Sequence, residues 1–467
     1  MTQDAAYLST VPVRPAGGLQ ERELLLTAAN DQALTDELLG KIFHPPPWLD
    51  RSILVTGLLS LILFSAIAYT LTTGIGTWGV TIPVAWGFAI TNFVWWIGIG
   101  HAGTFISAFL LLLEQKWRVS INRFAEAMTL FALMQAAVFP LLHLGRAWFF
   151  YWLVPYPNEM HIWPQFRSSL TWDVAAVSTY FTVSLLFWYF GLIPDLAAAR
   201  DRAPERWRRR AYGVFALGWS GSASDWHRHR ISYGLLAGIA APLVISVHSV
   251  VSMDFSIGIL PGWHSTIFPP YFVAGAIYSG FALVLTLLIP VRRAYRLEHV
   301  VTTAHLEKMA IMLMITGLIV TYAYGVETYL AWLGGDPFEM NNALHVRPLG
   351  RYAFLTWLVV FCNCVAPQSL WLRFVRRSPL SLFVLSLVIQ LGMWLERFVL
   401  IVSSQSADFL PSATHGFVPS LIDYALLGGT LCFFCFLFLL FLRFVPFIPI
   451  SELKALRLEL RRGTHGS

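Results

Sequence analysis

The sequence predicts an all-α polytopic membrane protein with about ten transmembrane helices, in two four-helix bundles (helices two to five and six to nine) flanked by helices one and ten. The first observation is composition: 57% of the 467 residues are hydrophobic, 12% are charged, and the mean hydropathy is +0.62. A water-soluble domain needs more polar residues to cover its surface. The other two observations are ten long apolar stretches and basic residues that alternate from loop to loop.

Both ends of the chain are predicted to lie outside the membrane. The first 20 residues lack the basic-then-apolar pattern of a secretory signal peptide. We therefore expect residues 1–50 to form a cytoplasmic N-terminal arm, helical around Glu21–Leu39 and ended by the three prolines at 45–47. Residues 444–467 are expected to form a cytoplasmic tail.

The membrane domain is predicted to cover residues 51–443, with the first bundle in 84–255 and the second in 269–403. A spanning helix needs about 20 mostly apolar residues. The stretches that meet this requirement are 52–73, 84–113, 124–144, 170–193, 231–255, 269–291, 306–333, 352–373, 380–403 and 418–442.

The distribution of Lys and Arg predicts the orientation of these helices. With ten spans, 27 of the 32 basic residues fall on the side that also holds both termini, and only four fall on the opposite side. Because cytoplasmic loops carry the excess of Lys and Arg, both termini are predicted to be cytoplasmic. The basic loop after helix four contains residues 206–219, which are predicted to form an amphipathic helix on the inner membrane surface.

A weak internal repeat supports two related bundles that keep the same orientation. Residues 98–113 of helix two align with residues 275–288 of helix six, which pairs Gly98 with Gly275, Gly103 with Gly280 and His101 with Tyr278. Small residues at such spacing let helices approach closely.

Ionisable side chains of five helices gather in the predicted outer half of the membrane. Such residues usually face a bundle interior or a cavity and mark a functional path. The set is His143, Asp173, His248, Asp254, Glu327, Glu396 and Arg397, with Tyr324 one turn from Glu327. His101 lies in the middle of helix two, either as part of this path or as a packing hydrogen bond.

This set of residues favours proton-coupled chemistry on a quinol. No metal-ligand spacing, nucleophile elbow or glycine-rich phosphate loop is present, and His143 and His248 lack the facing histidine pairs of a dihaem cytochrome b. A histidine beside an apolar cleft can take the proton of a quinol hydroxyl, because its pKa lies near working pH. Asp173 can orient that imidazole, Asp254 can carry protons outward, and Arg397 can balance the carboxylates.

Glu396 and Arg397 are neighbours in the sequence, but their side chains leave a helix about 100° apart. We therefore expect them not to form one salt bridge. Arg397 is assigned to the quinol cluster, and Glu396 to a separate helix contact as a protonated or proton-carrying group.

Several long stretches resemble one known family of membrane subunits. They include WWIGIGHAGTFISA (95–108), FPLLHLGRAW (139–148), VISVHSVVSMDF (244–255) and GMWLERFV (392–399). Between about residues 40 and 420, the chain resembles the ActC-type quinol-binding subunits of bacterial alternative complex III, within the NrfD/polysulfide-reductase membrane-subunit family.

The resemblance implies a subunit of a quinol:cytochrome c (or equivalent acceptor) oxidoreductase in a bacterial cytoplasmic (inner) membrane. It implies menaquinol or ubiquinol as substrate, His143 and Asp173 as catalytic residues, and Asp254 and Arg397 close by. Electrons would pass to an iron–sulfur subunit on the outer face and then to multihaem and monohaem c-type cytochromes of a respiratory or photosynthetic chain. An ActF-like paralogous subunit and lipids are the other expected partners. Neither a metal or haem in this chain nor a nucleic-acid partner is expected.

Two other functions are compatible with the same residues. One is an ActF-like scaffold or proton-path subunit without quinol, and the other is a secondary transporter, since repeats and midplane charges are transporter features. The one-sided clustering and the orientation-preserving repeat argue against the transporter. Whether protons are pumped beyond quinol deprotonation is left open.

Overall fold

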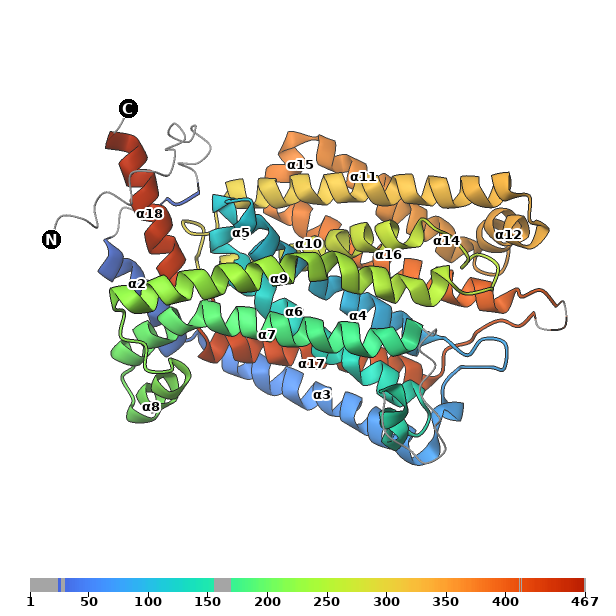
Figure 1. Ribbon diagram of the computed structural model, residues 1–467, viewed down its shortest axis with the longest axis horizontal. Coiled ribbons are helices and arrows are strands. Elements are labelled where there is room, and N and C mark those ends of the chain that lie inside the picture. The colour runs from blue at the N-terminus through green and yellow to red at the C-terminus, as the bar shows by residue number, and fades with distance from the viewer. Residues whose placement is uncertain (1–23, 27–29, 155–168, 411, 413, 466–467) are drawn as a thin grey trace.

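The computed structural model describes residues 24–26, 30–154, 169–410, 412 and 414–465, which form helices and connecting loops with no strand among them. Within this part of the chain, ten helices are long and apolar enough to cross a membrane. They run side by side along the long axis of the molecule (Figure 1). The predicted all-α polytopic membrane fold is therefore confirmed.

The spanning helices agree with the predicted stretches except at one end each of the first, fourth and fifth, which extend further than predicted. In chain order they are α3 (Pro47–Thr73), α4 with its continuation η2 and α5 (Phe88–Leu112), α6 (Asn122–His143), α7 (Ser169–Arg202), α9 (Ala223–Ser256), α10 (Phe268–Ala294), α11 (Thr303–Gly334), α14 with η6 and η7 (Ala353–Trp371), α16 (Pro379–Ser406) and α17 (Leu421–Phe444). Helix α7 continues past residue 193, and α9 begins before residue 231. Their added turns are polar, so hydropathy does not detect them.

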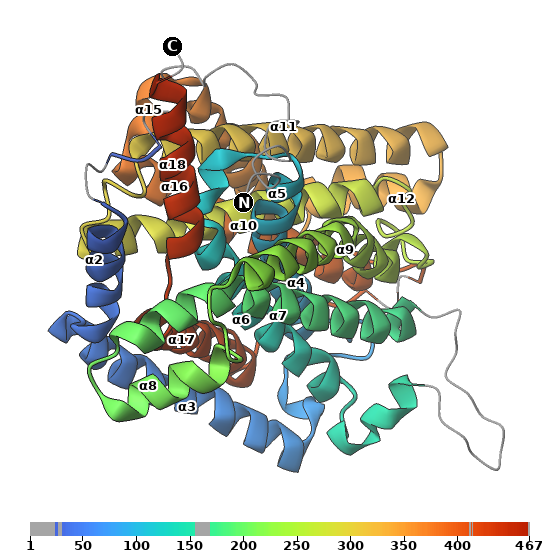
Figure 2. The ribbon, with the colours of Figure 1, turned by 60° about the vertical axis from the view of Figure 1, so that its left-hand side comes forward.

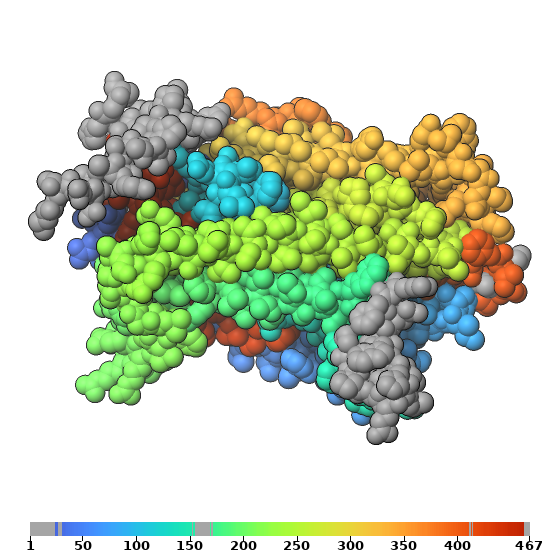
Figure 3. All heavy atoms as spheres, viewed as in Figure 1, coloured from blue at the N-terminus to red at the C-terminus, as the bar shows by residue number. Residues whose placement is uncertain are grey.

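Contacts between helices divide the membrane domain into two groups. Helices α4, α6, α7 and α9 pack together, as do α10, α11, α14 and α16, and α10 packs against α4 to join the groups. Helices α3 and α17 pair with each other and meet the first group at α6, at its lower edge in Figure 2. Figure 3 shows α9 extended along one face of the molecule with α7 beside it.

Two glycines allow the closest of these contacts. A Cβ atom at Gly103 of α4 would lie 2.0 Å from Thr129 Oγ1 and 2.1 Å from the carbonyl oxygen of Ala125 in α6. A Cβ atom at Gly280 of α10 would lie 2.2 Å from the Cβ atom of Ala102 in α4. These are the two glycines that the internal repeat aligns, and each brings one helix against the next.

The N-terminal helix differs from its prediction. Helix α2 spans Asp31–Phe43, because the Asn30 side chain accepts a hydrogen bond of 2.8 Å from the Ala33 N–H and starts the helix there. The predicted residues before 24 lie outside the described residues. The first spanning helix begins at Pro47, earlier than residue 51, because proline suits the first turn of a helix.

The basic segment after helix four forms α8 (Arg206–Phe215), as predicted. It projects to the side of the bundle at the end that also holds α2 and α18 (Figures 1 and 2). Arg206, Arg209 and Arg210 are exposed beside exposed Trp207, so the helix is basic and apolar on neighbouring faces.

The C-terminal tail folds back onto the first helix group as α18 (Ile450–His465). Glu452 accepts hydrogen bonds from Arg118 at 2.7 Å and from Asn122 at 3.0 Å. The Ser451 N–H donates to Asp195 at 3.0 Å, and Asp195 also pairs with Arg123 of α6 at 3.2 Å. The tail therefore closes the end of this group that lies near α2 (Figure 1).

Short helices connect the long ones. They are η1 (Ile75–Thr77), η3 (Lys116–Ser120), η4 (Ala147–Leu153), α12 (Pro337–Asn341), η5 (Asn342–Val346), α13 (Arg347–Leu349) and α15 (Arg373–Arg377). Helix α12 lies at the end of the molecule opposite α2 and α18 (Figure 1), which we call the distal end.

Candidate functional site

His143 is the last residue of α6, at the distal end. Leu144 and Gly145 return their N–H groups to Pro140 and Leu142, and the positive φ of 77° at Gly145 turns the chain away. The imidazole stacks on Trp78 at 6.3 Å and meets the edge of Trp86 at 6.3 Å. Its Nδ1 atom is buried and has no hydrogen-bond partner among the described residues. His143 thus offers a free ring nitrogen between two indoles.

Asp173 and Asp254 lie beside each other, both buried, in the first turns of α7 and the last turns of α9. The two carboxyl groups are close enough to act on each other electrostatically, and Ser169 lies near Asp254. Both oxygens of Asp173 and the Oδ1 atom of Asp254 are buried without a hydrogen-bond partner among the described residues. Two adjacent buried carboxyl groups can hold a proton between them.

The described residues show no hydrogen bond between His143 and Asp173, so the orienting role predicted for Asp173 stays a prediction. Aromatic rings connect the surroundings of His143 with the residue that follows Asp254. Trp86 touches His143 and also contacts Phe255, the residue after Asp254, at 6.0 Å. Trp86 further packs on Trp263 at 5.4 Å.

Sequence reasoning missed this aromatic cluster of Trp78, Trp86, Phe255 and Trp263, because it followed only ionisable residues. The signal that was available is the set of tryptophans in the polar connections 74–87 and 257–267, next to the ends that carry His143 and Asp254. Rings of this kind form the apolar walls of small-molecule sites.

His101 and His248 form a pair inside the first helix group. Their ring centroids are 4.7 Å apart, and both side chains are fully buried. His101 donates from Nδ1 to the Ile97 carbonyl at 2.6 Å and stacks on Tyr180 at 4.7 Å. His101 therefore makes a hydrogen bond within its own helix and also contacts His248, a second candidate residue. Neither ring nitrogen of His248 has a partner among the described residues.

Glu396 and Arg397 form a salt bridge of 2.8 Å, so the prediction that they would not pair is wrong. Their Cβ atoms do point in different directions, but both side chains are long enough to meet beside the helix. Both are buried, and two buried charges are far less costly together than apart. The Arg397 guanidinium also lies 4.0 Å from the ring centre of Phe272, and Arg397 is a charge neighbour of His248.

Glu396, Tyr324 and Glu327 belong to the second helix group. The Tyr324 hydroxyl donates to Glu396 and accepts from Asn363 at 2.8 Å. Glu327 pairs with Arg347 at 2.6 Å. Asn363 and Arg347 were not among the predicted site residues, because an amide and a loop arginine carry no sign of their partners in the sequence. The structure thus divides the predicted cluster between the two helix groups.

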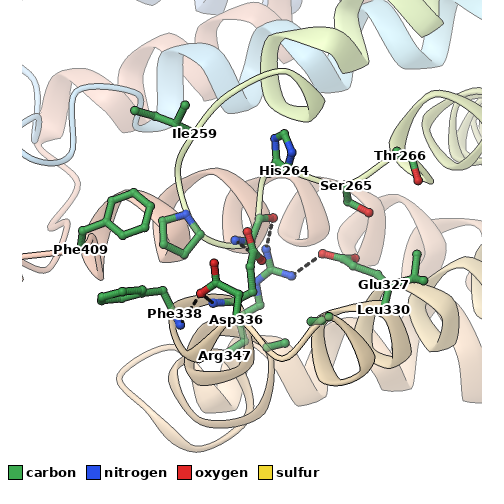
Figure 4. A pocket seen from close by; sticks show the side chains of 16 residues that line it. Ile259, His264, Ser265, Thr266, Glu327, Leu330, Asp336, Phe338, Arg347 and Phe409 are labelled. Atoms are coloured by element: carbon green, nitrogen blue, oxygen red, sulfur yellow. Dashed lines mark hydrogen bonds and ion pairs between the residues drawn. The ribbon is translucent and has the colours of Figure 1, made fainter.

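Two cavities lie beside the second part of this cluster at the distal end. One of about 470 Å³ is a hollow between the α9–α10 loop and the α11–α12 turn, where Arg347 reaches Glu327 and the Gly262 carbonyl (Figure 4). Burial raises the pKa of Glu339 at its edge, although the Gly262 N–H and Arg347 act in the opposite direction. The other cavity, of about 300 Å³, lies deeper between helices.

The described residues contain no group of three or more His, Cys, Asp or Glu side chains placed to hold a metal ion. The chemistry available at the distal end is therefore that of an imidazole, paired carboxyl groups, tyrosine hydroxyls and paired arginines. These groups accept, donate and hold protons.

Comparison with known proteins identifies the family. A sequence profile described as "Polysulphide reductase, NrfD" matches residues 78–407, which include every candidate residue named above. A putative membrane subunit of dimethyl sulfoxide reductase from Halobacterium salinarum is 28% identical over 238 residues, which are 50% of this chain and 50% of that protein. A selenate reductase subunit from Mesobacillus selenatarsenatis is 23% identical over 242 residues, 50% of this chain and 54% of that protein. The chain spans about half the length of the curated relatives that it matches. With a profile match across most of its length and ten membrane-spanning helices, the chain belongs to the NrfD polysulphide reductase family of multi-pass membrane proteins.

Proposed function

We propose that the chain is the membrane subunit of an oxidoreductase complex and oxidises quinol at the distal end of its first helix group. The observation that carries this proposal is the combination, at one end of the first helix group, of an unpartnered His143 nitrogen, the buried carboxyl groups of Asp173 and Asp254, and an aromatic wall beside His143. The two curated relatives are named as subunits of reductases, which supports a role in electron transfer.

The residues suit the proton chemistry of quinol oxidation. A quinol that becomes a quinone releases two electrons and two protons. The free Nδ1 atom of His143 can take the proton of one hydroxyl group, and the pair of Asp173 and Asp254 can take the other. Arg397 and the His101–His248 pair lie deeper and set the electrostatic field of the site. His143, Asp173 and Asp254 accept protons and not electrons. The two electrons are therefore assigned to a partner subunit.

At finer detail, we propose an ActC-type subunit of alternative complex III. The support is the length of the motifs around residues 95–108, 139–148 and 244–255, which resemble that type. In this assignment, menaquinol or ubiquinol gives electrons to an iron–sulfur subunit on the outer face, which passes them to multihaem and monohaem c-type cytochromes. An ActF-like subunit lies alongside, and both termini face the cytoplasm of a bacterium, as the 27 basic residues on that side indicate.

The names of the relatives suggest a different partner with the same quinol chemistry. In a complex like that of a dimethyl sulfoxide or selenate reductase, the electrons would go to a terminal reductase in place of cytochromes. Copurification separates the two assignments. Absorbance of c-type haem in the purified complex supports alternative complex III, whereas a bound terminal reductase without such haem contradicts it.

The proposal is tested by His143→Ala and Asp173→Asn in the complete complex purified from membranes. Each is expected to lower quinol:acceptor turnover by at least about 100-fold, the effect of losing a general base, while a denaturing gel shows every subunit in its normal amount. His415→Ala changes an exposed histidine and is the matched control, with turnover expected to stay near normal. Normal turnover in both site variants would rule out this site.

A further inference from the structure

The cavity of about 300 Å³ lies among α10, α11, α14 and α16, away from His143 and the carboxyl pair. Its walls are mainly apolar and include Val359, Val399 and Leu400. Its volume is at the lower end of the range of about 300–1,000 Å³ that is usual for small-molecule pockets. The chemistry of its polar side decides what kind of molecule it suits.

Tyr271, Tyr324 and Glu396 line that side, and Asn363 contacts Tyr324 from outside the cavity lining. Glu396 accepts a hydrogen bond from the Tyr324 hydroxyl, and the ring of Tyr271 lies 5.7 Å from the ring of Tyr324. Asn363 lies in η6 (Phe361–Val365), a π-helical turn that follows α14, and donates to Tyr324 at 2.8 Å. Segments of π-helix occur frequently at functional sites. The Oδ1 atom of Asn363 is buried without a partner among the described residues.

The charges around the cavity are paired with one another. Glu396 pairs with Arg397 at 2.8 Å and Glu327 with Arg347 at 2.6 Å. An anionic lipid headgroup would have to compete with a carboxylate for each arginine, whereas a neutral headgroup needs no change in the pairing. The cavity therefore suits an uncharged molecule with hydroxyl or carbonyl groups.

The cavity opens between α11 and α14. Thr328 of α11 and Trp357 of α14 line it and are exposed on the side of the bundle. On its other side, the Glu327–Arg347 pair separates it from the outer hollow, which both residues also line (Figure 4). A molecule with an apolar tail would thus enter from the lipid side, with its headgroup toward the polar side chains.

The internal repeat relates this cavity to the site around His143. A Cβ atom at Gly98 would lie 3.4 Å from His248 Cε1, and one at the aligned Gly275 would lie 3.0 Å from Arg397 Nη2. His248 belongs to helix five and Arg397 to helix nine, which are equivalent helices of the two groups. In helices two to five, one set of ends carries His143, Asp173 and Asp254. The cavity lies between the corresponding ends of helices six to nine.

We propose that this cavity is a second quinone site, which holds the neutral ring of a quinone or quinol while the tail passes between α11 and α14 into the lipid. It rests on the proposed function only for the choice of quinone as the neutral amphiphile. No electron transfer is assigned to it.

The test is photolabelling of the purified full complex with an azidoquinone, followed by mapping of the labelled peptides. We expect label in residues 324–328 and 353–360 as well as near His143. Val360→Trp fills the cavity entrance, so it should abolish the first two labels, spare the label near His143 and reduce the quinone extracted by one molecule per chain. Ile319→Trp places the same ring on an exposed position of α11 outside the cavity and should change neither label.

A second variant keeps the test decisive if Val360→Trp does not assemble. Tyr324→Phe removes one hydroxyl and should weaken labelling of residues 324–328 and 353–360 by about five-fold at limiting probe, the equivalent of one hydrogen bond. Label confined to the region of His143 would overturn the proposal. So would a phospholipid that native mass spectrometry finds bound to the wild type and lost from Val360→Trp. Normal turnover in both His143→Ala and Asp173→Asn, together with cavity labelling, would reject the proposed function and leave this site standing.

Discussion

Buried charges at the distal end have neighbours of two kinds. Glu396 and Glu327 each face an arginine, whereas Asp173 faces another carboxyl group. A paired charge is compatible with a stable interior, but a pair of carboxyl groups is stable only when a proton is held between them. The carboxyl groups without a cationic partner are therefore those assigned to proton transfer. This is expected where a protein loses stability in exchange for function.

This difference predicts that Asp254→Asn stabilises the protein while it reduces turnover. The amide removes the need for the pair to hold a proton and supplies Asp173 with a hydrogen-bond donor, a gain of about 1 kcal/mol. Thermal unfolding of the purified complex, followed by intrinsic fluorescence, should show a higher midpoint. Asp225→Asn is the control, because Asp225 accepts hydrogen bonds from Ser220 and Ser222 at the start of α9, and no stabilisation is expected there. A lower midpoint for Asp254→Asn would show that the two carboxyl groups are not neighbours.

Which residues matter was predictable from the sequence, but their partners were not. His143, Asp173, Asp254 and Arg397 stand out because ionisable groups are rare in apolar helices. The pairing of Arg397 with Glu396 depends on side-chain conformations, which helix geometry alone does not determine. The split into two sites likewise depends on which helices pack together.

At the scale of helices, Gly103 and Gly280 allow neighbouring helices to pack closely, because neither position has room for a Cβ atom. Gly103→Ala and Gly280→Ala would each drive a methyl group into a neighbouring helix, at a cost of about 1–3 kcal/mol for overpacking. We expect a lower midpoint of thermal unfolding and a lower yield of folded protein for both variants.

Two glycines of α9 provide the matched controls. A Cβ atom at Gly234 or Gly238 would meet nothing within 4 Å, so alanine there should be neutral or stabilise the helix by up to about 1 kcal/mol. Equal effects of all four substitutions would contradict the packing described for α4, α6 and α10.

The number and approximate ends of the spanning helices were predictable, because bilayer thickness fixes the length of an apolar helix. The π-helical turns η2 (Phe105–Phe109) and η6 leave no comparable signal in composition. The last turns of α7 were missed because their polar side chains pair with other parts of the chain, as Asp195 does with Arg123.

At the scale of the whole molecule, α18 and the membrane domain are joined by hydrogen bonds at the end opposite the distal end. Glu452→Ala should destabilise the protein by about 1–3 kcal/mol, because Arg118 and Asn122 both lose their partner. Glu459→Ala is the control: its contact with Lys116 is 3.7 Å long and exposed, and such pairs contribute little. Thermal unfolding of both variants checks this, and equal midpoints would show that α18 does not hold this end together.

The docking of α18 also sets an order of events during synthesis. Arg118, Asn122 and Asp195 enter the membrane domain early, yet their partners Ser451 and Glu452 are made only after the tenth spanning helix. Until then the end opposite the distal end exposes unsatisfied polar groups, which quality-control proteases and chaperones can recognise. A chain cut short after its tenth helix would keep all of its distal-end residues but would leave Arg118, Asn122 and Asp195 without Glu452 and Ser451 as partners.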